Sequence, residues 1–152
     1  MSEAATFWRY ISGSIDRLVA LAVECPSDVV SWMPPADGAN SILALAAHTL
    51  ANAEENILGL VLGRDVTRDR ESEFAPGADP AVLARRWQAL RAVVDAELPA
   101  IFDGRLPKVV AHPRRGEISV REVLIVVARH AAEHLGQAEL TRDLAIAALR
   151  RR

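Results

Sequence analysis

The segment that decides the fold is residues 119–149, which read SVREVLIVVARHAAEHLGQAELTRDLAIAAL. Its inward-facing positions recur every three or four residues, which is the period of one face of an α-helix. These positions are Val120, Val123, Val127, His130, His134, Gln137, Thr141, Leu144 and Ala148. Ser119 can cap the first turn, and Glu122 completes a capping box. The pattern predicts an amphipathic helix that carries both of its histidines on the side facing other helices.

Three further amphipathic helices are predicted upstream, because apolar side chains again recur every three or four residues. Their predicted ranges are Ala4 to near Cys25, Asn40 or Ser41 to Gly63, and Asp79 to near Pro99. Prolines and glycines follow these segments and end helices. Residues 64–79 are polar and charged and are predicted to form a loop. Between 102 and 118, around HPRRGE, a short hairpin and a plain loop fit equally well.

Four amphipathic helices with little strand signal predict an all-α four-helix bundle, connected either up and down or by a crossover. A chain of 152 residues is expected to form a single domain, residues 1–152, around one core. The net charge of -2 argues against a nucleic-acid partner. The chain has no apolar run of membrane-spanning length and no secretion signal, so we expect a cytoplasmic protein without membrane contact.

Histidines suggest a metal site inside this bundle. His130 and His134 are four residues apart, so they lie one above the other on a helix and can both reach one metal ion. A third ligand could come from His48 on the second predicted helix. That helix is apolar on nearly every side where His48 lies, so periodicity leaves the direction of His48 open. We therefore predict a divalent metal held by His48, His130 and His134.

Other interpretations of the histidines exist. A pair spaced by four arises by chance in some chains, and buried histidines can be neutral residues satisfied by hydrogen bonds. HAAEH also matches the H-x-x-E-H pattern of inverted zinc proteases, with Glu133 as general base. Those enzymes need a further downstream ligand, but only 18 residues follow His134. We therefore expect Glu133 to be a solvated helix residue. His112, in a segment rich in Pro and Gly, is predicted to be an ordinary surface residue and not a ligand.

Two stretches of the chain resemble the DinB/YfiT-like family. Residues 31–50, SWMPPADGANSILALAAHTL, form a Trp-x-Pro connection into a helix that carries His48. Residues 130–140, HAAEHLGQAEL, are similar to the family's last helix, with His, three residues, His, then Gly-Gln. The resemblance implies a DinB/YfiT-like bundle that binds zinc or nickel through His48 and the pair His130 and His134. It also implies a homodimer.

The resemblance further implies chemistry with a thiol. Some members of the family transfer a low-molecular-weight thiol such as mycothiol or bacillithiol, or use it as a cofactor in isomerisation. Arginine outnumbers lysine 17 to one, which indicates a high-GC bacterial genome and favours mycothiol, while glutathione or no thiol stays open. The leading hypothesis is a metal-dependent thiol S-transferase acting on an electrophilic small molecule, with Asn52 or Gln137 orienting solvent or substrate. The alternatives are a noncatalytic metal or small-ligand binding protein of a stress response, and a structural helical dimerisation module.

Overall fold

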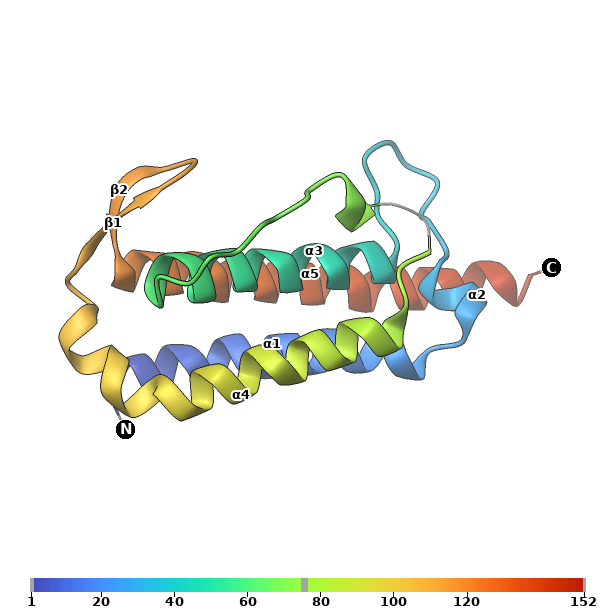
Figure 1. Ribbon diagram of the computed structural model, residues 1–152. Helices are drawn as coiled ribbons and strands as arrows, with labels where there is room; N and C mark the ends of the chain where they lie inside the picture. Colours follow the sequence, from blue (N-terminus) through green and yellow to red (C-terminus); the bar gives the residue numbers. More distant parts are fainter. Residues whose placement is uncertain (1, 75–76, 152) are drawn as a thin grey trace.

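Four long helices in two layers make up the protein (Figure 1). The computed structural model describes residues 2–74 and 77–151, and for 99–103 it describes the helical backbone only. The elements are α1 (Glu3–Glu24), α2 (Ser27–Val30), α3 (Ile42–Ala53), the π-helix η1 (Glu54–Val61), the 3-10 helix η2 (Ser72–Phe74), α4 (Pro80–Arg105), β1 (Val109–His112), β2 (Gly116–Ser119) and α5 (Val120–Leu149). The predicted all-α four-helix bundle is confirmed. Among the described residues, no helix has both the length and the apolar character of a membrane span.

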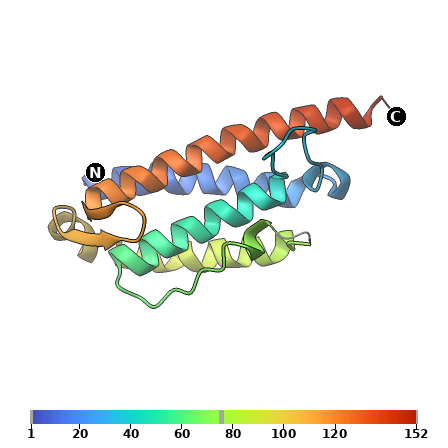
Figure 2. The ribbon, with the colours of Figure 1, turned by 90° about the horizontal axis from the view of Figure 1, so that it is seen from above.

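The connection between α3 and α4 is a crossover. In Figures 1 and 2, α1 and α5 run in one direction, and α3 and α4 both run in the other. The chain therefore returns along the outside of α3 before α4 begins, and residues 64–74 lie on this return. The structure thus selects the crossover over the up-and-down alternative. It also places the polar segment beside α3, where His48 lies.

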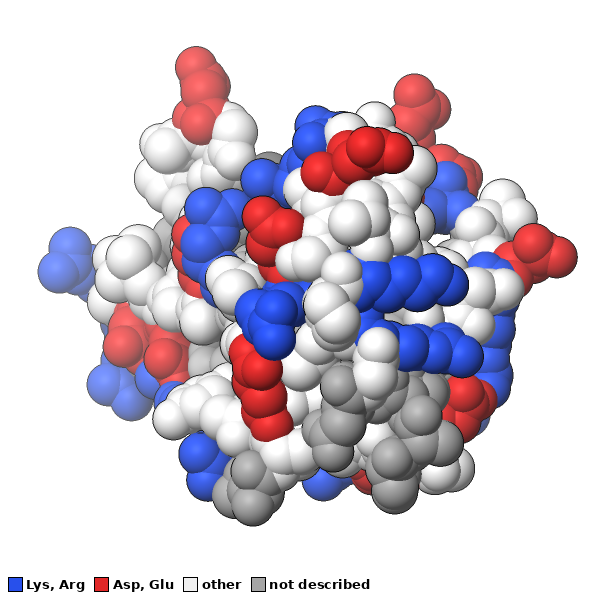
Figure 3. Space-filling view, turned by 90° about the vertical axis from the view of Figure 1, so that its left-hand side faces the viewer, with Lys and Arg blue, Asp and Glu red and all other residues white. Residues whose placement is uncertain are grey.

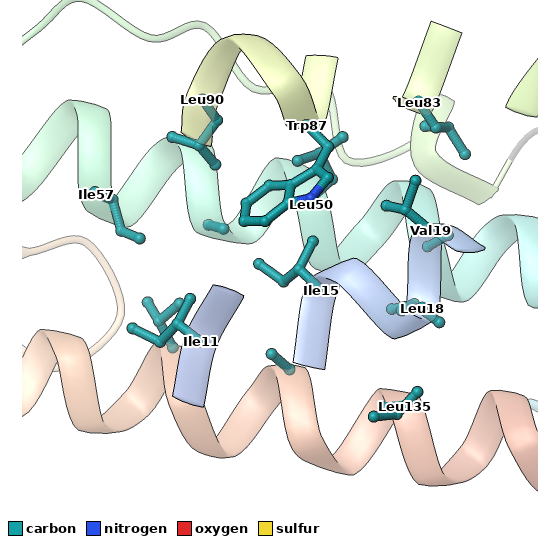
Figure 4. Packing of buried hydrophobic residues seen from close by; sticks show 14 of the residues in the cluster. Ile11, Ile15, Leu18, Val19, Leu50, Ile57, Leu83, Trp87, Leu90 and Leu135 are labelled. Carbon is teal, nitrogen blue, oxygen red and sulfur yellow. The ribbon is translucent and has the colours of Figure 1, made fainter. Parts of the chain in front are cut away.

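The core lies between the two layers, and all four long helices contribute to it. Figure 4 shows side chains of α1, α3, α4 and α5 pointing toward one another across this space. The largest fully buried side chains are Ile11, Ile15, Leu18, Ile42, Leu50, Ile57, Leu90, Leu124, Val94, Val120 and Val123. Burying one such side chain stabilises the fold by about 1.5–3 kcal/mol. The core therefore holds α3 and α5 in a fixed register, which the site between them requires.

Two buried tryptophans fix α1 against α4. The indole N–H of Trp8 donates to Asp95 at 2.6 Å, and that of Trp87 donates to Asp16 at 2.8 Å. Their ring centroids are 5.8 Å apart. Each ring is buried while its one polar atom reaches a carboxylate at the edge of the core, which is the arrangement a buried tryptophan needs.

The second predicted helix changes character halfway. It is α-helical to Ala53 but π-helical over Glu54–Val61, where the backbone N–H of Leu62 reaches the carbonyl of Ile57 at 2.9 Å. The side-chain amide of Asn56 donates to the carbonyl of Asn52 at 2.8 Å. That carbonyl is the acceptor an α-helix would offer to the backbone N–H of Asn56, so the side chain competes with the regular pattern. The apolar spacing could not predict this change.

The predicted end of the third helix near Pro99 is wrong, because α4 continues to Arg105. A proline removes one backbone donor from a helix. Contacts beyond it offset this loss. Leu106 is buried at 3% exposure, and the guanidinium of Arg105 donates to the carbonyl of Val61 at 3.1 Å.

The hairpin alternative before α5 is the correct one. β1 and β2 pair antiparallel, with Val109 opposite Ser119 and His112 opposite Gly116. The prediction that His112 is a surface residue is wrong, because it is only 4% exposed and its Nδ1 accepts from the backbone N–H of Arg114 at 3.1 Å. Alternate residues of a strand face the same side, so His112 follows the half-buried Val110 toward the bundle.

The start of α5 provides a test of the local fold. Ser119 Oγ accepts from the backbone N–H of Glu122 at 3.2 Å, and the Glu122 carboxylate accepts from the backbone N–H of Ser119 at 2.7 Å. We expect Ser119→Ala to lower the free energy of unfolding by about 0.5–2 kcal/mol, measured by urea denaturation. Ser119→Thr keeps the acceptor and should lose less. Equal stability of the two variants would contradict this role of the cap.

Candidate metal centre

Three imidazole nitrogens converge between α3 and α5. His130 Nε2 lies 3.0 Å from His48 Nε2 and 3.2 Å from His134 Nε2, and one ligand nitrogen of each residue lies within 4.8 Å of the others. A tetrahedral ion with bonds of roughly 2.0–2.1 Å holds its nitrogen ligands about 3.3 Å apart. The structure thus answers the question that periodicity left open, because His48 points toward the pair on α5. The three histidines could hold one metal ion.

The two histidines of α5 lie at the edge of its buried face and not at its centre. The buried positions of this helix are Val120, Val123, Leu124, Val127, Ala131, Leu135, Ala138, Thr141 and Ala145. His130 and His134 are half-buried. The site is consequently held by the core on one side and accessible to small molecules on the other.

Side chains outside the triad fix the orientation of two of the rings. The Nδ1 of His48 lies 2.7 Å from the carboxylate of Glu73, and the Nδ1 of His134 lies 2.7 Å from the side-chain oxygen of Gln137. Both partners are acceptors, so each Nδ1 carries the hydrogen and each Nε2 keeps its lone pair. Metal-binding histidines commonly have this arrangement, with the second ring nitrogen bound to a carboxylate or carbonyl.

Hydrogen bonds alone leave this cluster unsatisfied. His48 and His134 each present an Nε2 lone pair, and neutral His130 has a single N–H to offer. It can satisfy only one of them. Its own Nδ1 is buried without a hydrogen-bond partner among the described residues, and a metal bound at Nε2 would leave that atom unchanged. A cation between the three Nε2 atoms would bind all three lone pairs at once, so the donor set fits a metal better than a satisfied cluster of core histidines.

Burial also keeps the imidazoles of His48 and His130 in the form that binds metals. It lowers the pKa of His130 to about 3, and the nearby His134 and His48 act in the same direction. Burial lowers the pKa of His48 as well, although the hydrogen bond to Glu73 opposes this. Both rings are neutral at neutral pH. Neutral imidazole is the form that donates a lone pair to a metal.

A network of charged residues behind His48 was not found from the sequence. Glu73 is 5% exposed, and its carboxylate accepts a hydrogen bond from the guanidinium of Arg68 at 2.6 Å. Arg68 also binds Glu55 at 2.7 Å, and Arg114 of the hairpin binds the same Glu55 at 2.9 Å. Burial alone would raise the pKa of Glu73, but hydrogen bonds from Arg68 and His48 lower it, so Glu73 is ionised. The crossover and the hairpin are therefore joined beside the triad.

Two cavities border the triad. One, of about 370 Å³, adjoins His134 and Gln137 and is closed mainly by small and apolar side chains that include Leu45 and Leu140. The other, of about 170 Å³, adjoins His48 and is lined largely by arginines. The triad therefore lies between two cavities, one lined by His134 and the other by His48 and His130.

Glu133 takes no part in this site. Its side chain is 52% exposed and approaches Arg129, one turn earlier on α5, at 3.6 Å. An exposed pair of this kind contributes little to stability. The prediction that Glu133 is a solvated helix residue agrees with this position.

The fold and the site define a helical bundle with a three-histidine centre between its helices. Comparison with known families matches residues 10–138 to the DinB superfamily. The chain therefore belongs to the DinB superfamily, which confirms the resemblance of its motifs. A crystal structure described as that of the conserved protein of locus from Enterococcus faecalis superposes with a TM-score of 0.76 at 19% identity, over 97% of this chain and 99% of that chain. At this identity the match shows a common fold. No curated protein matches the chain.

Proposed function

We propose that the protein is a metal-dependent thiol S-transferase with His48, His130 and His134 as ligands of a zinc or nickel ion. The observation that supports this most is the convergence of three Nε2 atoms beside two cavities. A divalent ion there supplies Lewis acidity, which favours the deprotonated and nucleophilic form of a thiol. The thiol is of low molecular weight, with mycothiol as the first candidate, and the acceptor is an electrophilic small molecule.

The residues around the triad have distinct roles in this proposal. Glu73 and Gln137 hold the Nδ1 hydrogens of His48 and His134 and so keep both rings in place. The apolar cavity beside His134 takes the apolar part of the electrophile and excludes water from it. In the transfer, the thiol sulfur forms a bond to the electrophilic carbon. The leaving group departs with the electron pair of its bond, and the thiol proton passes to solvent.

Several features of the hypothesis are independent of the site geometry. A cytoplasmic location and a single domain of residues 1–152 stay predictions from the sequence. A homodimer stays a prediction from the resemblance to the family. None of them is needed for the chemistry proposed here, because all three ligands come from one chain.

The proposal is tested by turnover. Metal-loaded protein is mixed with mycothiol, bacillithiol, glutathione or 2-mercaptoethanol, each with a chromogenic aryl halide. We expect at least one thiol to react about tenfold or more faster than with the His48→Ala, His130→Ala, His134→Ala triple variant. Equal rates for both proteins with every thiol would contradict the proposal. Tight metal binding without turnover would instead support the noncatalytic alternative.

A further inference from the structure

The smaller cavity beside the triad has a strongly basic lining. Its volume is about 170 Å³, and His48, Asn52 and His130 form its inner wall. The arginines that line it are Arg68, Arg70, Arg114, Arg115 and Arg129. Among the described residues around this cavity there is no Asp or Glu. These arginines come from three separate segments, namely the crossover, the hairpin and α5, and all of them line the same cavity.

Neighbouring acidic side chains neutralise only part of the positive charge of these arginines. Arg68 binds Glu55 and Glu73, and Arg114 binds Glu55. Among the described residues, Arg129 pairs with Glu133 alone, one turn further along α5, at 3.6 Å.

Arg70 and Arg115 make no ion pair with any residue in the described part of the chain. Burial lowers the pKa values of His48, His112 and His130, so these rings add no positive charge at neutral pH. The five arginines of the lining therefore carry more positive charge than the neighbouring Glu55, Glu73 and Glu133 balance.

The excess of positive charge is confined to the cavity and does not extend over the surrounding surface. Figure 3 views the end of the bundle that carries the hairpin, where basic and acidic side chains lie interspersed. A surface of mixed sign does not suit a long polyanion. A basic cavity of limited size suits a small anionic group.

Asn52 is a second observation that points to a ligand. It is only 7% exposed, it lines the same cavity, and its Oδ1 has no hydrogen-bond partner among the described residues. A buried polar atom without a partner is costly and rare in native proteins. Oδ1 is an acceptor, so an O–H or N–H group next to the anionic group of the same ligand would satisfy it, and the anionic oxygens themselves would not.

We infer that this cavity binds the carboxylate or phosphate group of one of the two reactants. Guanidinium groups match both anions with paired hydrogen bonds. Cavities that enclose whole ligands have volumes of about 300–1,000 Å³, so this one holds a charged end group while the reactive end lies at the triad. That the anion belongs to a reactant rests on the proposed function, but the binding of an anion does not.

Anion binding is tested by titrating the metal-loaded protein with succinate, and separately with inorganic phosphate, in a calorimeter. We expect Arg70→Gln with Arg115→Gln to weaken binding of at least one anion about tenfold or more. The matched control is Arg85→Gln with Arg151→Gln, which removes two exposed arginines outside the cavity and should bind as wild type does. Succinamide, which is uncharged, should not bind. Equal affinities of the two double variants, or no anion binding to wild type, would overturn the inference.

Two pairs of substrates then identify which reactant carries the anion. In the first pair, the KM values of 3-mercaptopropionate and 2-mercaptoethanol are compared, each measured with an uncharged electrophile. In the second pair, the KM values of chloroacetate and chloroacetamide are compared, each measured with an uncharged thiol. The pair whose KM difference disappears in the Arg70, Arg115 double variant contains the anionic reactant. An unchanged KM difference in both pairs would overturn the assignment to a reactant. Arginine-dependent succinate binding without any thiol transfer would contradict the proposed function alone.

Discussion

Protein purified without chelators is expected to contain near-stoichiometric zinc or nickel, and its His130→Ala variant is expected to contain almost none. His130 is the middle ligand, because its Nε2 lies 3.0 Å from that of His48 and 3.2 Å from that of His134. Without it two imidazoles are left, and we expect the metal affinity to fall by about 100-fold or more. Elemental analysis of both proteins, with no metal added, measures the difference.

Two variants control for nonspecific effects of the substitution. His112→Ala removes another histidine that lines the arginine-rich cavity but lies outside the triad. Glu133→Ala changes an exposed residue next to His134 on the same helix. Both should keep the metal content of wild type. If wild type contains no metal and binds added zinc or nickel no better than His130→Ala does, the metal site is refuted and a structural bundle becomes the best account.

The helices could be predicted because each signal is local. Ser119 and Glu122 form the capping box that their spacing predicts. The crossover could not be predicted, because the direction of α4 relative to α3 depends on packing across the bundle. The change to π-helical turns in η1 coincides with a side-chain hydrogen bond from Asn56 to the carbonyl of Asn52, and neither feature alters the apolar period of the sequence.

The site was predictable only where its signals are local in the sequence. His130 and His134 are fixed relative to each other by one helix, so their spacing predicts that they meet. The network that holds His48 joins residues that are distant in sequence, and Arg68 and Glu73 come from a segment whose composition indicates a solvated loop. Its length was the available signal, because loops of more than about 12–15 residues in compact domains are commonly functional. His112 was misjudged because burial of its strand depends on the hairpin docking against the bundle.

Glu73→Ala is expected to weaken metal binding and to destabilise the protein. Its carboxylate holds the Nδ1 hydrogen of His48 at 2.7 Å, and loss of such a partner costs about 10–100-fold in metal affinity. It also pairs with Arg68, and the exposures of the two side chains are both 5%. Removing one member of a buried ion pair lowers the free energy of unfolding by about 3–5 kcal/mol. Glu55 still pairs with Arg68 in this variant, so the lower end of that range is expected.

The two effects are separated by comparison with Glu55→Ala. Glu55 binds the same guanidinium at 2.7 Å, but the structure gives it no hydrogen bond to a triad histidine. Glu55→Ala should therefore destabilise the fold while leaving the metal affinity within about twofold of wild type. Metal affinity is measured by competition with a chromogenic chelator. Stability is measured by urea denaturation of metal-free protein, because bound metal would add its own stabilisation.

Glu73→Gln is a milder variant that keeps the test possible if Glu73→Ala does not fold. Glutamine keeps an oxygen that can accept from both His48 and Arg68 but removes the negative charge. We expect a smaller loss of stability than for Glu73→Ala and a metal affinity between that variant and wild type. Equal losses of metal affinity in Glu73→Gln and Glu55→Gln would mean that the carboxylate acts only through Arg68. An intermediate affinity confined to Glu73→Gln would instead assign its effect to the direct contact with His48, and so to the orientation of one ligand of the triad.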